Sequence, residues 1–154
     1  MTEPVERRTG DRRAPGLGPS GQLMLYVLLV LLVGTGASWL WAHYLPEQFE
    51  RWMIDPWQVE SWSMKIHGGA AMVALFGAGT LLHVHMRSAW RQRRNHYSGV
   101  AMAATLFLLA ASGYGLYYFN GETSRQWAEW LHWATGFGIP LMLIAHGIIG
   151  RRTR

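Results

Sequence analysis

Four runs without a single Asp, Glu, Lys or Arg divide the chain at regular intervals. They cover residues 23–42, 66–85, 99–119 and 131–149. Each run has about 20 residues, enough for one helix to cross a hydrocarbon core of about 30 Å. None of them keeps the polar face of a helix in a soluble protein. We therefore predict an all-α fold, an up-down bundle of four transmembrane helices.

The composition agrees with a membrane protein and excludes several kinds of site. Of the 154 residues, 50% are hydrophobic, 15% are charged and 18 are Gly. Most of the glycines lie inside the runs, where small residues let helices pack closely. The chain has no Cys, which excludes disulfides, thiolate metal sites, iron–sulfur clusters and covalently attached haem.

Basic residues predict the orientation in the membrane. Most of the 14 Lys and Arg lie in residues 1–22, in the connection between the second and third runs, and in residues 150–154. The positive-inside rule therefore places both termini in the cytoplasm of a bacterial inner membrane, with residues 1–22 as a disordered basic tail. The arginines are split among three short segments, which argues against nucleic-acid binding and favours attraction to anionic lipid.

Tryptophans mark the opposite interface. Eight of the 9 Trp map to the periplasmic side, as in an aromatic belt: Trp39, Trp41, Trp52, Trp57, Trp62, Trp127, Trp130 and Trp133. Residues 46–61 form a predicted interfacial segment with a short amphipathic helix. Its Phe49, Trp52, Met53 and Trp57 are expected to face lipid. An alternative role for this surface is docking of a partner protein or a quinol.

Five of the 7 histidines lie within or at the ends of the runs: His67, His83, His85, His132 and His146. Ionisable residues inside a membrane are rare and usually functional. The second and fourth predicted helices run in the same direction, so His67 and His132 lie near the outer end and the other three near the inner end. Two pairs at two depths suit two stacked cofactors held between the same two helices.

Helical geometry selects the partners within each pair. His132 and His146 share a face about 21 Å apart, and His67 and His85 share a face about 27 Å apart. His83 lies about 160° from His67 and is the runner-up to His85. The two separations differ by about 6 Å, a mismatch that requires helix tilt or a local irregularity.

Haem is the cofactor that these histidines favour. Neutral imidazole is a good axial ligand of haem iron, and without Cys the haem would be non-covalent, hence b-type. Ala71, Ala74 and Ala78 leave a slot for a macrocycle on the His67 face, and Gly136 lies on the His132 face. The candidate propionate partners are Arg87 on the inner side and Lys65 or Arg125 on the outer side.

Residues 64–152 resemble the small bacterial four-helix b-type cytochromes, which are related to the dihaem cytochrome b subunits of membrane hydrogenases and formate dehydrogenases. The motifs that carry the resemblance are Ile66-His67-Gly68, His85-Met86-Arg87, Arg93-Arg94-Asn95, Ser112-Gly113-Tyr114-Gly115, and Trp130-Leu131-His132-Trp133 followed by His146. The resemblance implies transmembrane electron transfer. In the hydrogenase and formate dehydrogenase subunits the first helix supplies one ligand, whereas here the first run has no internal His and His43 lies at its outer end.

The sequence thus predicts a membrane cytochrome that transfers electrons between a quinone pool and a periplasmic redox partner. His67 and His132 would hold an outer haem b, and His85 and His146 an inner one. No nucleophile–base pair, phosphate loop or paired carboxylates lie in the runs, so an electron-transfer subunit is expected rather than a self-sufficient enzyme, alone, as a homodimer or in a larger complex.

Three alternatives stay open. In the first, the histidines are hydrogen-bonding bridges between helices. In the second, the chain is the anchor or assembly subunit of an oxidoreductase, with one haem or none. In the third, it is a membrane protein that handles Cu or Zn. Transporters usually show internal repeats and broken helices, and neither is evident in the sequence.

Overall fold

The computed structural model describes residues 18–81 and 96–152, and its regular structure is entirely helical. The helices are α1 (Pro19–Tyr44), α2 (Pro46–Arg51), α3 (Pro56–Leu81), α5 (His96–Tyr118) and α6 (Glu122–Arg152). No strand occurs in the two described ranges. The predicted all-α fold is therefore confirmed for this part of the chain, and most helices extend beyond the apolar runs.

Three of the described helices are long and apolar enough to cross a membrane. They are α1, the part of α5 that begins at Tyr97, and α6 as far as Ile149. The described part of α3 is less apolar, because Lys65, His67 and four glycines interrupt its hydrophobic residues. Residues 82–85, which complete the predicted second span, lie outside the described residues. The fourth span stays a prediction.

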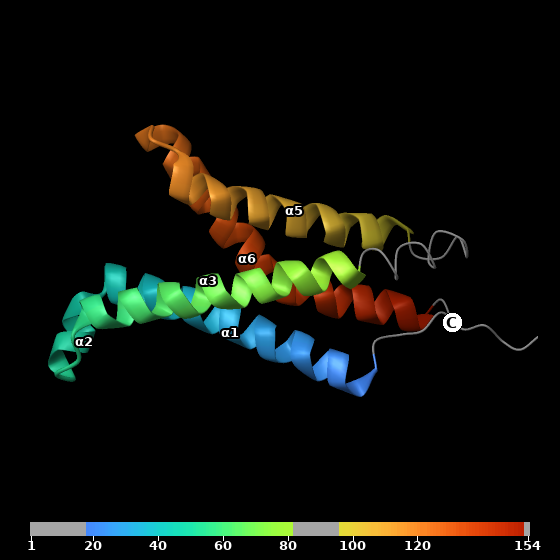
Figure 1. The fold of residues 1–154 in the computed structure, drawn as a ribbon, viewed down its shortest axis with the longest axis horizontal. Coiled ribbons are helices and arrows are strands. Elements are labelled where there is room, and N and C mark those ends of the chain that lie inside the picture. Colours follow the sequence, from blue (N-terminus) through green and yellow to red (C-terminus); the bar gives the residue numbers. More distant parts are fainter. Residues whose placement is uncertain (1–17, 82–95, 153–154) are drawn as a thin grey trace, which may run out of the picture.

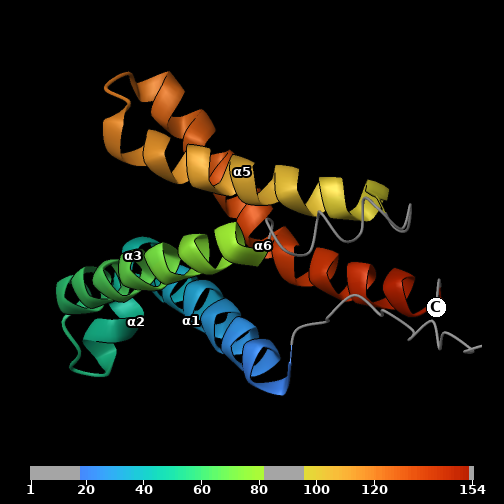
Figure 2. The same cartoon turned by 45° about the vertical axis from the view of Figure 1, so that its right-hand side comes forward.

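The four long helices alternate in direction (Figures 1 and 2). The short helix α2 and the turn between α5 and α6 lie at one end of the molecule, called here the α2 end. The start of α1, the end of α3, the start of α5 and the end of α6 lie at the opposite end. This is the order of an up-down bundle. Which end faces the cytoplasm stays a prediction.

The helices pack as two pairs. The first hairpin is α1 with α3, the second is α5 with α6, and contacts between the hairpins are few. Only small residues and one phenylalanine are buried among the described residues: Ala42, Phe49, Ser63, Ala70, Ser112, Gly115 and Ala128. No large side chain there is completely enclosed. The described helices therefore turn most of their apolar side chains outward, as lipid-facing helices do.

The connection between α1 and α3 corrects one prediction. Phe49 is only 7% exposed, and its ring packs edge-on against Trp41, with ring centres 5.4 Å apart. The prediction that Phe49 faces lipid is wrong, because α2 folds back on α1 and turns this face inward. Trp52, Met53 and Trp57 are exposed, as expected. The interfacial helix is also short, since α3 already begins at Pro56.

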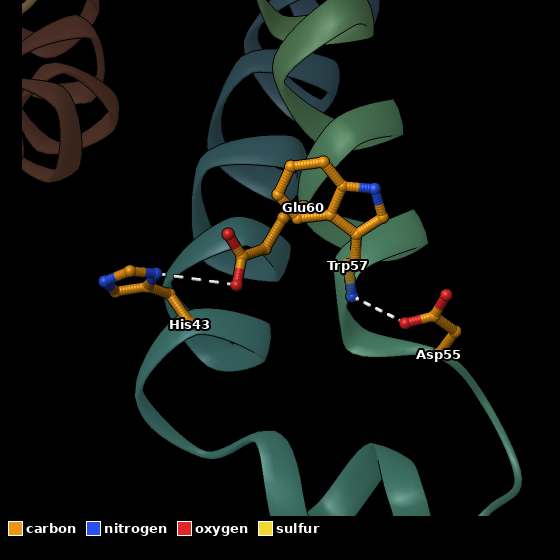
Figure 3. A network of polar contacts seen from close by, with 4 residues as sticks. All are labelled: His43, Asp55, Trp57 and Glu60. Atoms are coloured by element: carbon orange, nitrogen blue, oxygen red, sulfur yellow. Dashed lines mark hydrogen bonds and ion pairs between the residues drawn. The ribbon is translucent and has the colours of Figure 1, made fainter.

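A side-chain cap starts α3 (Figure 3). The backbone N–H of Trp57 donates a hydrogen bond to Oδ1 of Asp55 at 3.0 Å. Pro56 is the first helical residue, where its fixed φ suits a helix and its missing N–H costs nothing. Asp55 therefore occupies the position where a carboxylate satisfies a free helix N–H and favours the positive end of the helix dipole.

Replacing this cap should destabilise the first hairpin. We expect Asp55→Ala to lower the free energy of unfolding by about 1 kcal/mol, whereas Asp55→Ser, which keeps a hydrogen-bond acceptor, should lose much less. Thermal unfolding of the purified protein in detergent, followed by circular dichroism, measures both. Equal stability of the alanine and serine variants would show that the cap does not contribute.

Candidate cofactor site

One histidine from each hairpin meets the other between the pairs. The rings of His67 on α3 and His132 on α6 have centres 6.1 Å apart, with their planes inclined by 62°. Both side chains are partly buried. This is the outer pair predicted from the sequence, and the structure brings its two members together. Their role as ligands stays a prediction.

His67 is held by a hydroxyl group of α1. Its Nδ1 lies 3.0 Å from Oγ1 of Thr35. The single hydroxyl proton of Thr35 is donated to the backbone carbonyl of Leu31 at 2.6 Å, so this oxygen can only accept from the ring. The proton of the neutral imidazole is therefore on Nδ1, and Nε2 carries a lone pair.

His132 is held in the same way by α5. Its Nδ1 lies 3.1 Å from Oγ of Ser112 and 3.2 Å from the backbone carbonyl of Leu109. The Ser112 hydroxyl donates to that same carbonyl at 3.1 Å, and a carbonyl can only accept. Nδ1 of His132 therefore carries the proton too. A hydrogen bond at one ring nitrogen that leaves the other as a metal ligand is typical of ligating histidines.

A glycine lies against each imidazole ring. A Cβ on Gly36 would lie 3.6 Å from Cε1 of His67, and a Cβ on Gly113 would lie 3.2 Å from Cε1 of His132. Each glycine directly follows the hydroxyl residue that binds the same ring. The neighbouring helix can therefore approach closely enough for its hydroxyl to reach Nδ1.

The predicted inner pair is not assembled within the described residues. Nδ1 of His146 lies 3.1 Å from Oγ of Ser98, a contact between α6 and α5. His83, His85 and Arg87 lie outside the described residues. The pairing of His146 with His85 therefore stays a prediction, as does the role of Arg87.

The two outer propionate candidates differ in position. The ammonium of Lys65 lies 4.8 Å above the ring of Trp62, and Lys65 is only two residues before His67, on a different face of α3. Nε of Arg125 lies 3.7 Å from Oε1 of Glu129. Arg125 precedes His132 by two helical turns and shares its face, about 10 Å nearer the α2 end. Arg125 is therefore the better placed of the two.

His43 belongs to a separate contact at the α2 end. Its ring stacks on Trp39, with ring centres 4.6 Å apart. Its Nδ1 lies 3.5 Å from Oε1 of Glu60 on α3 (Figure 3). This histidine is bound to residues of the first hairpin and makes no ring contact with the His67–His132 pair.

The donor set fits haem better than a bare metal ion. No group of three or more His, Asp or Glu able to hold a metal ion occurs among the described residues. Haem needs only two axial ligands from the protein, because the porphyrin supplies the rest. His67 and His132 are two such donors, with ring centres 6.1 Å apart.

Comparison with family models, curated proteins and solved structures finds no match for this chain. The resemblance to four-helix b-type cytochromes therefore stays an expectation that depends on the motifs quoted above.

Sequence reasoning missed the hydroxyl residues of the site. Thr35, Ser98 and Ser112 each bind one histidine, whereas the sequence assigns no role to these hydroxyls and Ser112 stands there only within a motif of the resemblance. The available signal is a hydroxyl residue directly before a glycine in an otherwise apolar run, which occurs at Thr35-Gly36, Ser112-Gly113 and Thr135-Gly136. The third hydroxyl bonds only backbone carbonyls of its own helix, so the pattern alone does not identify the site.

The two glycines should respond differently to alanine. Alanine favours a helix over glycine by about 1 kcal/mol, so Gly36→Ala, with an ordinary contact, should leave stability unchanged or raise it. Gly113→Ala must displace the His132 ring, and overpacking of this kind costs about 1–3 kcal/mol. We expect only Gly113→Ala to lower the thermal midpoint in detergent. The hypothesis fails if both variants are equally stable.

Proposed function

We propose that this protein is a membrane-bound b-type cytochrome that passes electrons between a quinone pool and a periplasmic redox partner. The observation that carries the proposal is the approach of His67 and His132 from opposite hairpins, each with its proton fixed on Nδ1. The proposed cofactor and its electron transfer follow from what two such imidazoles can bind.

Hydrogen bonding between the histidines does not explain their approach. Because both protons lie on Nδ1 and are donated within each hairpin, neither ring can donate to the other through Nε2. Each Nε2 instead offers a lone pair to an electron-pair acceptor. Haem iron is such an acceptor, and it takes neutral imidazole axially.

The packing between the hairpins supports an apolar cofactor. The hairpins share few contacts, and no large side chain among the described residues is enclosed between them. Ala71, Ala74 and Ala78 are partly buried on the His67 side of α3, and Gly136 is partly buried on α6. A flat macrocycle would bury these small residues and connect the hairpins.

Bound haem would supply a one-electron iron couple, whose potential depends on its axial ligands and their hydrogen bonds. His67 and His132 would hold an outer haem, with Arg125 or Lys65 at its propionates. His85, or His83 as runner-up, would hold an inner haem with His146, and Arg87 would bind its propionates. Transfer across the whole membrane depends on that inner haem.

The exposed tryptophans of the α2 end favour a second role as a membrane anchor for a partner oxidoreductase. Six are largely exposed there: Trp41, Trp52, Trp57, Trp62, Trp127 and Trp130. Exposed aromatic residues suit both the lipid interface and a protein partner. In this role the chain would carry one haem or none.

An optical spectrum tests the proposal directly. We expect the purified protein to show a b-type spectrum that sharpens on dithionite reduction, with about two haems per chain by pyridine haemochrome if both predicted pairs are occupied. A ratio of about one would restrict the proposal to a single pair. Absence of a Soret band, after expression with sufficient haem, would exclude the cytochrome and favour the anchor.

Substitution of the histidines identifies the ligands. His67→Ala and His132→Ala should each remove the outer haem, because one axial ligand is lost. His43→Ala is the matched control, since this histidine is bound at the α2 end, and it should keep the full haem content. Haem content is then compared between the wild type and His146→Ala, and a loss of haem in the variant would assign His146 to the inner haem. Full haem content in His132→Ala would refute the assignment.

A further inference from the structure

The two hairpins contain the same pair of short sequence elements. The first is Leu-Leu-x-x-Thr/Ser-Gly, at residues 31–36 of α1 and 108–113 of α5. The second is Trp-small-x-x-aliphatic-His, at residues 62–67 of α3 and 127–132 of α6. The expectation that the chain has no internal repeat therefore needs correction. The elements are only six residues long, and the segment between them is twelve residues longer in the first hairpin.

Matching positions of the two elements make matching contacts. Thr35 and Ser112 bind Nδ1 of His67 and His132 at 3.0 and 3.1 Å. Gly36 and Gly113 lie against the same two rings. The same two hydroxyls lie 3.3 and 3.1 Å from the backbone carbonyls of Leu32 and Leu109.

The residues that flank the histidines also correspond. Ser63 and Ala128, each four residues before the histidine, are both buried, at 7% and 5% exposure. Trp62 and Trp127, each five residues before it, are both exposed. The correspondence therefore extends to burial as well as residue type.

The repeat does not extend to the opposite end of the bundle. The contact of Ser98 with His146 lies in the second hairpin alone. The positions of the first hairpin that match these residues are Gly21 and Leu81, which provide neither a hydroxyl nor an imidazole. The repeated arrangement thus builds one site, the one between His67 and His132.

We propose that each hairpin is one half of a repeated cofactor site, and that Thr35 and Ser112 are equivalent positioning residues for its two axial imidazoles. This inference rests on the proposed haem-binding function. Each hydroxyl accepts the Nδ1 proton, fixes the ring plane and increases electron donation from Nε2 to iron. Because the two halves correspond, the two hydroxyls should contribute equally.

The test compares hydroxyl-free and hydroxyl-retaining variants of the full-length, haem-loaded protein. Thr35→Val and Ser112→Ala each remove one acceptor with little change of volume, and a double variant removes both. Thr35→Ser and Ser112→Thr keep the hydroxyl. The control is Thr135→Val, because the Thr135 hydroxyl bonds only backbone carbonyls of α6, those of Leu131 and His132.

Two readouts report on the imidazoles themselves. In redox titrations, each hydroxyl-free variant should shift the ferric–ferrous equilibrium of the outer haem about tenfold toward the ferrous form, equal to about 59 mV for one electron. The double variant should shift it by about the sum. Low-temperature electron paramagnetic resonance of the ferric state should change as well, since it reports the mutual angle of the axial rings. Hydroxyl-retaining variants and the control should match the wild type.

The outcomes separate this inference from the proposed function. If wild-type protein binds no haem, both fail. If it binds haem but Thr35→Val and Ser112→Ala keep the wild-type potential and resonance spectrum, the positioning role alone is overturned. If only one of the two variants, Thr35→Val or Ser112→Ala, changes the potential and the resonance spectrum, the equivalence of the hairpins is refuted. Loss of haem in Thr35→Val that Thr35→Ser restores would support the proposal, whereas loss in both would overturn it.

Discussion

An imidazole ring between lipid-facing helices must place its N–H against an acceptor, because no water is present there to receive it. Most of the described structure around the site follows from this requirement. Thr35 and Ser112 supply the acceptors from the neighbouring helix of each hairpin. Those helices must therefore pack closely at that depth, and the glycine after each hydroxyl residue permits it. Each ring is then fixed, with its second nitrogen free to bind a ligand.

The hairpins themselves are weakly joined. Between helices in lipid the hydrophobic effect adds little, so packing and polar contacts determine association. The contacts between the two helices of each hairpin are extensive, whereas the contacts between the two hairpins are few. A cofactor bound to one histidine of each hairpin would add the missing contacts. Since any ligand of the folded state stabilises it by mass action, assembly of the four helices and binding of the cofactor would be coupled.

Much of the fold was predictable from the sequence because uncharged runs of membrane-spanning length have few alternatives to helices. The runs predicted α1, α5 and α6 as spans, and the common direction of α3 and α6 predicted that His67 and His132 lie at similar depth. The span predicted at residues 66–85 stays a prediction, because residues 82–85 lie outside the described residues.

Other features depended on information that a hydropathy pattern does not contain. Nothing in the α1 run indicates which of its faces meets α3, so Thr35 could not be assigned to His67. The inward turn of Phe49 depends on how α2 folds back on α1, which is a tertiary contact. The repeated elements are difficult to detect in the sequence, because only a few positions of each helix make the matching contacts. Only the structure places those positions side by side.

The correspondence of the two hairpins also determines how an asymmetric ligand can orient. Two equivalent half-sites, as proposed, would present the same imidazole to either face of a macrocycle, so the two histidines alone would not distinguish its two orientational isomers. That choice falls to the rim of the site, where the halves differ. Two turns before each histidine, α3 has Glu60 beside His43 and α6 has Arg125 beside Glu129. At this level the first hairpin has the carboxylate of Glu60, whereas the second has an ion pair of Arg125 with Glu129, so an anionic edge would meet less repulsion at the second hairpin. The charges at the rim, rather than the ligands at the centre, would therefore select one isomer.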